Sequence, residues 1–444
     1  MKHRILLLAL GLAAAVPLAL LATLGDLAAR APLMLALWGG AHAIYLFASW
    51  LAVRGPAHDA GTGEPSRAGE LRWGPIVGIL VVGLVPRLAL LTAPPSLSGD
   101  LYRYLWDGRL VAHGVNPYSM APADPGLARF RDGLFPLLNH ASVPTVYPPA
   151  AQILFAGAAL LGATPLAWKL LLFLLEAALV AVLISLQKRR RLHLERLLLY
   201  YWNPLVIVEC YGSGHVDLAA AALLLAAIYL QETGRRTASG LYFGAAIVTK
   251  WIPILLVPAL LRRRAWSVLA WAALLAAVLY APFLPAGASL VEGLRIYARH
   301  WEFNGPLYAL LRPLFRTGDS PRLILAAGLA VATVAIAWRA RSLSGAALAT
   351  WAAFLLFSPT VYPWYLIPAV ALLPLHPDAG LLLFSGTVAL TYAPLAAYRA
   401  TGAWRLPGWV MVVEYGTWAA VAAGSWWLSR RSAAAARAGH RRGC

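Results

Sequence analysis

Residues 5–24 read ILLLALGLAAAVPLALLATL, a run of 20 positions without one charged side chain. Folded as an α-helix, such a run is about 30 Å long, which matches the hydrocarbon thickness of a bilayer. The preceding Met1-Lys2-His3-Arg4 is basic, as at the start of a signal peptide, but further apolar segments of similar length follow. The run therefore predicts a retained first transmembrane helix.

Runs of this kind recur along the chain. Of the 444 residues, 61% are hydrophobic and only 12% are charged, too few charges for a soluble protein of this size. We predict an all-α, polytopic membrane protein, a single integral membrane domain over residues 1–444 with about 12 spanning helices. The expected spans are 5–24, 32–53, 74–93, 165–186, 197–212, 216–232, 265–283, 323–340, 345–357, 363–375, 379–396 and 408–428. Two shorter, Pro-containing runs, 148–163 and 239–261, are expected to be short re-entrant hairpins.

The basic side chains predict the orientation. They cluster just beyond apolar runs, at 188–191, 235–236, 262–264 and 430–442, as cytoplasmic loops do. With a cytoplasmic N-terminus and two re-entrant runs, every cluster lies inside; if both runs cross, two clusters face outward. We therefore predict a multi-pass protein of the cell (inner) membrane. Its cytoplasmic parts include a linker at 55–71 and a basic tail at 429–444, and its external parts are a large loop at 94–147 and the segments 284–322 and 358–362.

Several function classes lack a visible site. The net charge of +19 comes largely from the loop clusters, and no polar domain exists to carry nucleic acid. Cys210 and Cys444 are too few for a disulfide framework or a cysteine metal site. Walker-type, dinucleotide-binding and HExxH motifs are absent, so nucleotide chemistry has no visible site on the cytoplasmic side. An activated donor on the outer face would have to be delivered by a lipid.

The external loop contains the most informative stretch, Ser98-Gly99-Asp100-Leu101-Tyr102-Arg103-Tyr104-Leu105-Trp106-Asp107-Gly108-Arg109. The helical spacing of Tyr102, Leu105 and Trp106 predicts an amphipathic segment along the membrane surface. Asp100 stands where a helix N-cap belongs, so it is either a cap or a functional carboxylate. The remaining charges form either local ion pairs or a binding surface for a charged sugar lipid. A loop of this length in a compact protein favours function.

Other polar residues are expected on the same outer face. The stretch Gly212-Ser213-Gly214-His215-Val216-Asp217 is either a binding loop or a polar turn. Lys250 interrupts the run 239–261, where it either neutralises a phosphate or extends to the interface. His300 is either a partner of the same phosphate or a solvated histidine. In Tyr362-Pro363-Trp364-Tyr365, the residues Trp364 and Tyr365 favour an interfacial belt.

Three further charges fall within or near the expected spans. Charges there are costly, so they are usually paired or functional. Glu209 lies just inside the membrane boundary. Lys169 and Glu176 lie on one face of the same helix, and partners on other helices are equally open.

Together the external motifs resemble the GT-C superfamily of integral membrane glycosyltransferases, and within it the bacterial mannosyltransferase-like members of glycosyltransferase family 87. Each motif is short, but their order covers roughly residues 95–365. The stretches that carry the resemblance are Ser-Gly-Asp-Leu-Tyr-Arg at 98–103, Gly-Val-Asn-Pro-Tyr at 114–118, Tyr-Pro-Pro at 147–149, Trp-Asn-Pro-Leu at 202–205, Gly-Ser-Gly-His-Val-Asp at 212–217, Thr-Lys-Trp-Ile-Pro at 249–253, His-Trp-Glu-Phe-Asn at 300–304 and Tyr-Pro-Trp-Tyr at 362–365.

The resemblance implies roles for these residues. Asp100 is expected to be the general base that deprotonates an acceptor hydroxyl, although it lacks the neighbouring acid that some members carry. Arg103, Lys250 and His300 are expected to bind the phosphate of the donor. The expected substrate-binding residues are Tyr102, Asp107, Arg109, Tyr147, His215, Asp217 and Tyr362. One His and one Asp in the second acidic motif are too few to indicate a metal, so no cofactor is expected, although the sequence leaves a divalent ion open.

The expected function is transfer of a hexose, with mannose as the family-level choice, from a polyprenyl-phosphate-sugar donor on the outer face. The acceptor would be a glycolipid or a glycan such as a polysaccharide. A different class, a transporter or flippase of a lipid-linked sugar, is the alternative, as is a non-catalytic assembly factor. A transporter typically shows inverted repeats and polar residues at the midplane, whereas this chain concentrates polar groups on one face.

Overall fold

The computed structural model describes residues 2–54 and 73–442, so the linker predicted at 55–71 lies outside the described residues. Regular structure in the described part is helical apart from isolated bridges that join Phe303 and Asn304 to Thr360. The α-helices are α1 (Lys2–Leu20), α2 (Ala31–Arg54), α3 (Trp73–Leu91), α4 (Asp100–Ala112), α5 (Pro149–Leu160), α6 (Pro165–Arg189), α7 (Leu198–Tyr201), α8 (Pro204–Ile207), α9 (Asp217–Glu232), α10 (Arg236–Ile247), α11 (Val257–Arg262), α12 (Trp266–Tyr280), α13 (Glu292–His300), α14 (Pro306–Leu311), α15 (Asp319–Arg339), α16 (Leu343–Phe357), α17 (Ile367–Leu372), α18 (Ala379–Thr387), α19 (Leu395–Thr401) and α20 (Gly408–Arg442).

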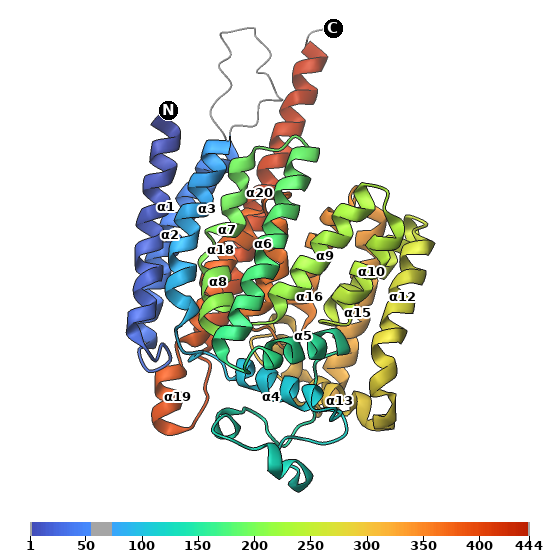
Figure 1. Ribbon diagram of the computed structural model, residues 1–444. Coiled ribbons are helices and arrows are strands. Elements are labelled where there is room, and N and C mark those ends of the chain that lie inside the picture. Colours follow the sequence, from blue (N-terminus) through green and yellow to red (C-terminus); the bar gives the residue numbers. More distant parts are fainter. Residues whose placement is uncertain (1, 55–72, 443–444) are drawn as a thin grey trace.

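The upright helices form two groups in Figure 1. One contains α1, α2, α3, α6, α7, α8, α18 and α20, and the other contains α9, α10, α12, α15 and α16. Both chain ends lie at the upper end of the view, whereas α4, α5, α13 and α19 lie at the lower end. The fold is therefore the predicted all-α polytopic one, with the 94–147 segment at the end opposite the termini.

Six helical segments of the described residues are long and apolar enough to cross a membrane on their own: 2–24, 31–54, 165–189, 266–300, 319–339 and 379–401. The predicted span 408–428 lies within the long helix α20, and the remaining predicted spans form shorter or broken helices. The run 197–212 is the clearest case, since it contains α7, α8 and then a π-helical turn, Val208–Ser213. Pro204 has no N–H to donate, and Asn203 restarts the helix by accepting from the backbone N–H of Leu205 at 3.0 Å.

Each of the two short apolar runs begins and ends on one side of the molecule, although 148–163 forms the single helix α5 rather than the expected hairpin. α5 lies beside α4 at the lower end, and α6 starts from there (Figure 1). The run 239–261 descends as α10, turns at Lys250 and returns through the 3₁₀ turn Ile252–Leu256 and α11. The two segments are in contact where α5 begins: the backbone N–H of Ala150 donates to the Val248 carbonyl at 2.8 Å.

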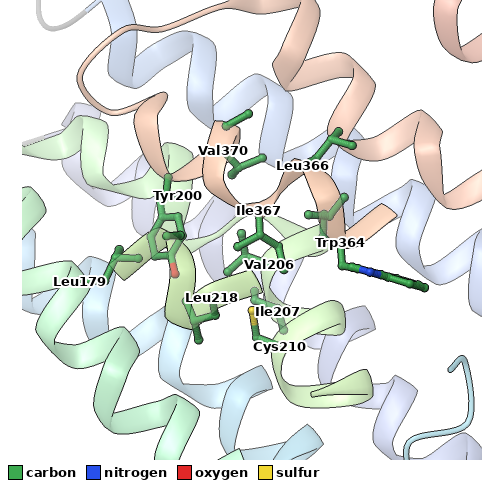
Figure 2. Close-up of a cluster of buried hydrophobic side chains, with 14 of the residues drawn as sticks. Leu179, Tyr200, Val206, Ile207, Cys210, Leu218, Trp364, Leu366, Ile367 and Val370 are labelled. Atoms are coloured by element: carbon green, nitrogen blue, oxygen red, sulfur yellow. The ribbon is translucent and has the colours of Figure 1, made fainter. Parts of the chain in front are cut away.

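Helix α4, which begins with Asp100, packs closely on α5. At Gly108 an added Cβ would lie 2.2 Å from the Phe155 carbonyl oxygen, so only glycine permits this approach. A core of buried apolar side chains comes from α6, α7 to α9 and α17, and Figure 2 shows part of it. Trp364 lies at the edge of this cluster and points away from the other labelled side chains.

The charges within the expected spans are paired between helices. Glu176 of α6 accepts two hydrogen bonds of 2.7 Å from Arg87 of α3. Lys169 donates to the carbonyls of Leu90, at 3.2 Å, and Ala93, at 2.6 Å, at the end of α3. The sequence left open whether Lys169 and Glu176 pair with each other or with other helices. In the structure, both bond to residues of α3 or just after it.

Candidate active site

A cavity of about 640 Å³ lies at the end of the molecule that carries α4 and α5. Separate parts of the chain build its wall, which explains why no single motif identified it. Its lining comes from the start of α4, the end of the 94–147 segment, the tip at Lys250, α13 and the residues after it, and the stretches 362–365 and 392–404. The cavity is therefore where most of the external motifs of the sequence converge.

Asp100 is the first residue of α4, and its carboxylate faces the cavity. The residue in the N-cap position is Gly99, and the Asp100 side chain makes no capping bond. Asn139 donates to Asp100 Oδ1 at 2.8 Å, and Tyr147 donates to Oδ2 at 3.3 Å. The helix N-terminus also favours negative charge at this position. The structure thus does not use Asp100 as the N-cap of α4, and its carboxylate lies at the cavity wall.

Tyr147 lines the cavity beside Asp100. Burial, with Asp100 close by, holds the pKa of Tyr147 well above its ordinary value. The phenol therefore keeps its proton and remains a donor to the carboxylate. Its ring packs edge-on against Tyr104 and Phe155, so the direction of that donor is fixed by packing.

Arg103 lines the cavity one helical turn after Asp100. It donates from Nε to Asp107 at 2.8 Å and from Nη1 to the Val143 carbonyl at 3.0 Å. Its Nη2 is buried and has no hydrogen-bond partner within the part of the chain that is described. Asp107 lies behind the wall and anchors Arg103, so this ion pair is buried rather than solvated.

Lys250 and Asp217 form a second ion pair, which is part-buried. The ammonium of Lys250 lies 2.7 Å from Asp217 Oδ1 and 4.5 Å from the centre of the Tyr365 ring. Lys250 lines the cavity, whereas Asp217, the first residue of α9, is only 1% exposed. The structure thus joins two predicted site residues that are 33 positions apart.

The remaining predicted residues divide into two sets. Tyr362 and His300 line the cavity, Tyr362 being stacked between Phe303 and Trp364. Tyr102 and Arg109 are not among the described lining residues; Arg109 instead pairs with Asp132. His215 is fully buried behind the wall, stacked on Trp364 at 3.7 Å.

Sequence reasoning did not single out Asn139 and His140, and it gave Glu209 no role at the site. Asn139 holds Asp100, and His140 lines the cavity edge-on to Trp301. Burial lowers the pKa of His140, so its ring is neutral at neutral pH. Glu209 lies 3.3 Å from His215 Nε2. Asn139 and His140 come from an irregular loop, where no periodicity marks which side chains turn inward.

No group of three or more His, Cys, Asp or Glu side chains that could hold a metal ion occurs within residues 2–54 and 73–442. The carboxylates of the site are already committed to protein donors: Asp100 to Asn139 and Asp217 to Lys250.

A multi-pass helical fold with a carboxylate and basic side chains around a cavity at its loop-bearing end agrees with the GT-C membrane glycosyltransferase class that the sequence motifs indicated. Residues 6–266 match the family model described as alpha-(1->6)-mannopyranosyltransferase, N-terminal domain. The chain belongs to this family, as the external motifs indicated. The matched region contains Asp100, His215, Asp217 and Lys250, whereas His300 and Tyr362 lie beyond it.

A curated relative is alpha-(1->6)-mannopyranosyltransferase A of Mycobacterium tuberculosis. The two sequences are 29% identical over 221 residues, which cover 48% of this chain and 39% of the relative. The chain thus matches about two fifths of the length of that protein. Both comparisons support a mannosyltransferase-like protein of the membrane.

Proposed function

We propose that this protein is a mannosyltransferase that uses a polyprenyl-phosphate-mannose donor and acts at the outer face of the inner membrane, with a glycan or glycolipid as acceptor. The observation that carries the proposal is Asp100, a carboxylate held by two donors at the wall of a cavity that also contains Lys250 and Arg103. The family match and the printed name of the relative support mannose as the sugar.

The proposed reaction is a single displacement. The acceptor hydroxyl oxygen attacks the anomeric carbon of the donor sugar while Asp100 takes the hydroxyl proton. The new glycosidic bond forms as the bond between that carbon and the phosphate oxygen breaks, and polyprenyl phosphate leaves with the bonding electron pair.

Lys250 and Arg103 are the groups proposed to stabilise the charge that develops on the phosphate. Arg103 lines the cavity, and Lys250 presents an ammonium whose position is fixed by Asp217. Donors that are placed before the reaction stabilise a developing charge without reorganising. His300, at the end of α13, is proposed as a further phosphate contact at the cavity rim.

Purified protein in lipid nanodiscs tests the proposal. It would be given polyprenyl-phosphate [³H]mannose and, in parallel, polyprenyl-phosphate [³H]glucose and GDP-[³H]mannose, with a membrane glycolipid extract as acceptor. We expect label in the acceptor fraction only from polyprenyl-phosphate mannose. Transfer from GDP-mannose, or movement of the intact donor across the bilayer without transfer, would contradict it.

A further inference from the structure

His215 lies directly behind Asp100 with a carboxylate at each of its two ring nitrogens. His215 Nδ1 is 4.0 Å from Asp100 Oδ2, and Nε2 is 3.3 Å from Glu209 Oε2. His215 and Glu209 are both fully buried, with 0% side-chain exposure. Neither ring nitrogen makes a hydrogen bond within the described residues. Buried polar groups without partners are costly, so this arrangement needs an explanation beyond packing.

Glu209 is held in place by the fold around it. Its Oε1 accepts from the Tyr392 hydroxyl at 2.8 Å, and its backbone carbonyl accepts from the N–H of His215 at 3.0 Å. It belongs to the π-helical turn Val208–Ser213, a backbone form that is rare and frequent at functional sites. The turn ends at Gly214, whose φ of 79° lets the chain bring His215 back over Glu209.

Trp364 also fixes the plane of the His215 ring. Trp364 stacks on it with centroids 3.7 Å apart and an interplanar angle of 14°. Two carboxylates and an indole face therefore surround the ring and constrain its orientation.

We infer that His215, oriented by Glu209, is a positioning residue for Asp100. It acts from the side of Asp100 that faces away from the cavity, so it directs the carboxylate toward the acceptor hydroxyl without touching substrate. The 4.0 Å separation is longer than a hydrogen bond. Such contacts are often long in empty sites and shorten when substrate binds. The inference rests on the proposed role of Asp100 as base.

Two replacements of the same histidine separate positioning from packing. The amide of Asn reproduces a group near Nδ1, which faces Asp100, and the longer Gln reproduces one near Nε2, which faces Glu209. We expect His215→Gln to lower kcat roughly 10- to 100-fold, the usual cost of losing an orienting partner. His215→Asn should retain more of the wild-type kcat. Because His215 lies behind the wall, KM for donor and acceptor should stay within about twofold in both variants.

Glu209→Gln tests whether Glu209 orients His215. It keeps the shape but removes the charge that orients His215, so kcat should fall while KM is unchanged. His42 supplies the matched control, since it is a buried histidine of α2 whose Nε2 contacts the Leu382 carbonyl at 3.1 Å, away from the cavity. His42→Gln and His42→Asn should keep the wild-type kcat.

The outcomes distinguish this inference from the proposed function. If wild-type protein transfers mannose and His215→Gln has an unchanged kcat at an unchanged melting temperature, the positioning role is wrong and the proposed function stands. If His215→Asn and His215→Gln lose activity only in proportion to lost folded protein, the role is also wrong. If the wild-type protein transfers no sugar from any lipid donor, the proposed function itself fails.

Discussion

Lys250 owes its position to a single carboxylate, that of Asp217. Asp217→Asn replaces the carboxylate with a neutral amide, which attracts the ammonium of Lys250 too weakly to hold it in place. We expect kcat/KM for the lipid donor to fall roughly tenfold, about 1.4 kcal/mol, because the phosphate loses a fixed cation. Steady-state kinetics over a range of donor concentrations measures the change.

The control for this prediction is Glu292→Gln, which neutralises a carboxylate of an exposed pair with Arg295 on α13. Exposed pairs contribute little, so its kinetics should match wild type. An Asp217→Asn variant with the kinetics of Glu292→Gln would show that the ion pair has no part in donor binding.

The placement of Asp100 in an outer segment could be predicted from the sequence because the apolar runs and basic clusters locate the loop. Its partners could not. Asn139 lies 39 positions further on in irregular structure, and His215 reaches Asp100 only because a π-helical turn redirects the chain. The i,i+4 spacing of Arg103 and Asp107 does predict their ion pair, but its burial depends on the segment around Val143 that covers it.

The contact between α4 and α5 depends on Gly108. A Cβ there would lie 2.2 Å from the Phe155 carbonyl oxygen and 2.9 Å from the Ala156 nitrogen, both backbone atoms that cannot move independently. Gly108→Ala should destabilise the protein by about 1–3 kcal/mol, the usual cost of overpacking. Thermal unfolding in detergent, followed by tryptophan fluorescence, checks this.

Gly157 provides the matched control on α5, since an added Cβ there meets nothing within 4 Å. Gly157→Ala should keep or slightly raise the melting temperature, because alanine favours the helix. Equal melting temperatures for Gly108→Ala and Gly157→Ala would contradict the close helix contact.

Long uniform helices such as α2 and α6 follow from their apolar runs, with bounds within a few residues of those predicted. The run 197–212 reads as one span by hydropathy, yet it forms α7, α8 and a π-helical turn. Pro204 signals a break, but the π-helical turn has no sequence signature of its own. Its stability comes from tertiary partners such as Tyr392, which a single-sequence pattern does not contain.

The cavity lies at the end of the molecule that carries α4 and α5. Both chain ends lie at the opposite end (Figure 1). The orientation predicted from the basic clusters places the cavity outside the cell. Ser119, in the 94–147 segment, and Thr237, in the first turn of α10, are both exposed. In a Cys444→Ser background, a membrane-impermeant maleimide should label Ser119→Cys in intact spheroplasts and Thr237→Cys only after permeabilisation.

The buried Cys210 should not react in either condition, so the background variant alone is the control. Labelling of Thr237→Cys but not Ser119→Cys in intact spheroplasts would invert the topology. The proposed lipid donor would then have to act from the cytoplasmic face.

The role of Asp100 is tested most directly by mannose transfer from polyprenyl-phosphate mannose by the Asp100→Asn variant, compared with wild type and Asp124→Asn. Asp124 caps a short 3₁₀ turn in the same segment, where asparagine is an equally good cap. We predict that Asp100→Asn lowers kcat roughly 10²- to 10⁴-fold at normal expression and melting temperature, whereas Asp124→Asn matches wild type. Transfer by Asp100→Asn at the rate of Asp124→Asn would contradict Asp100 as the base.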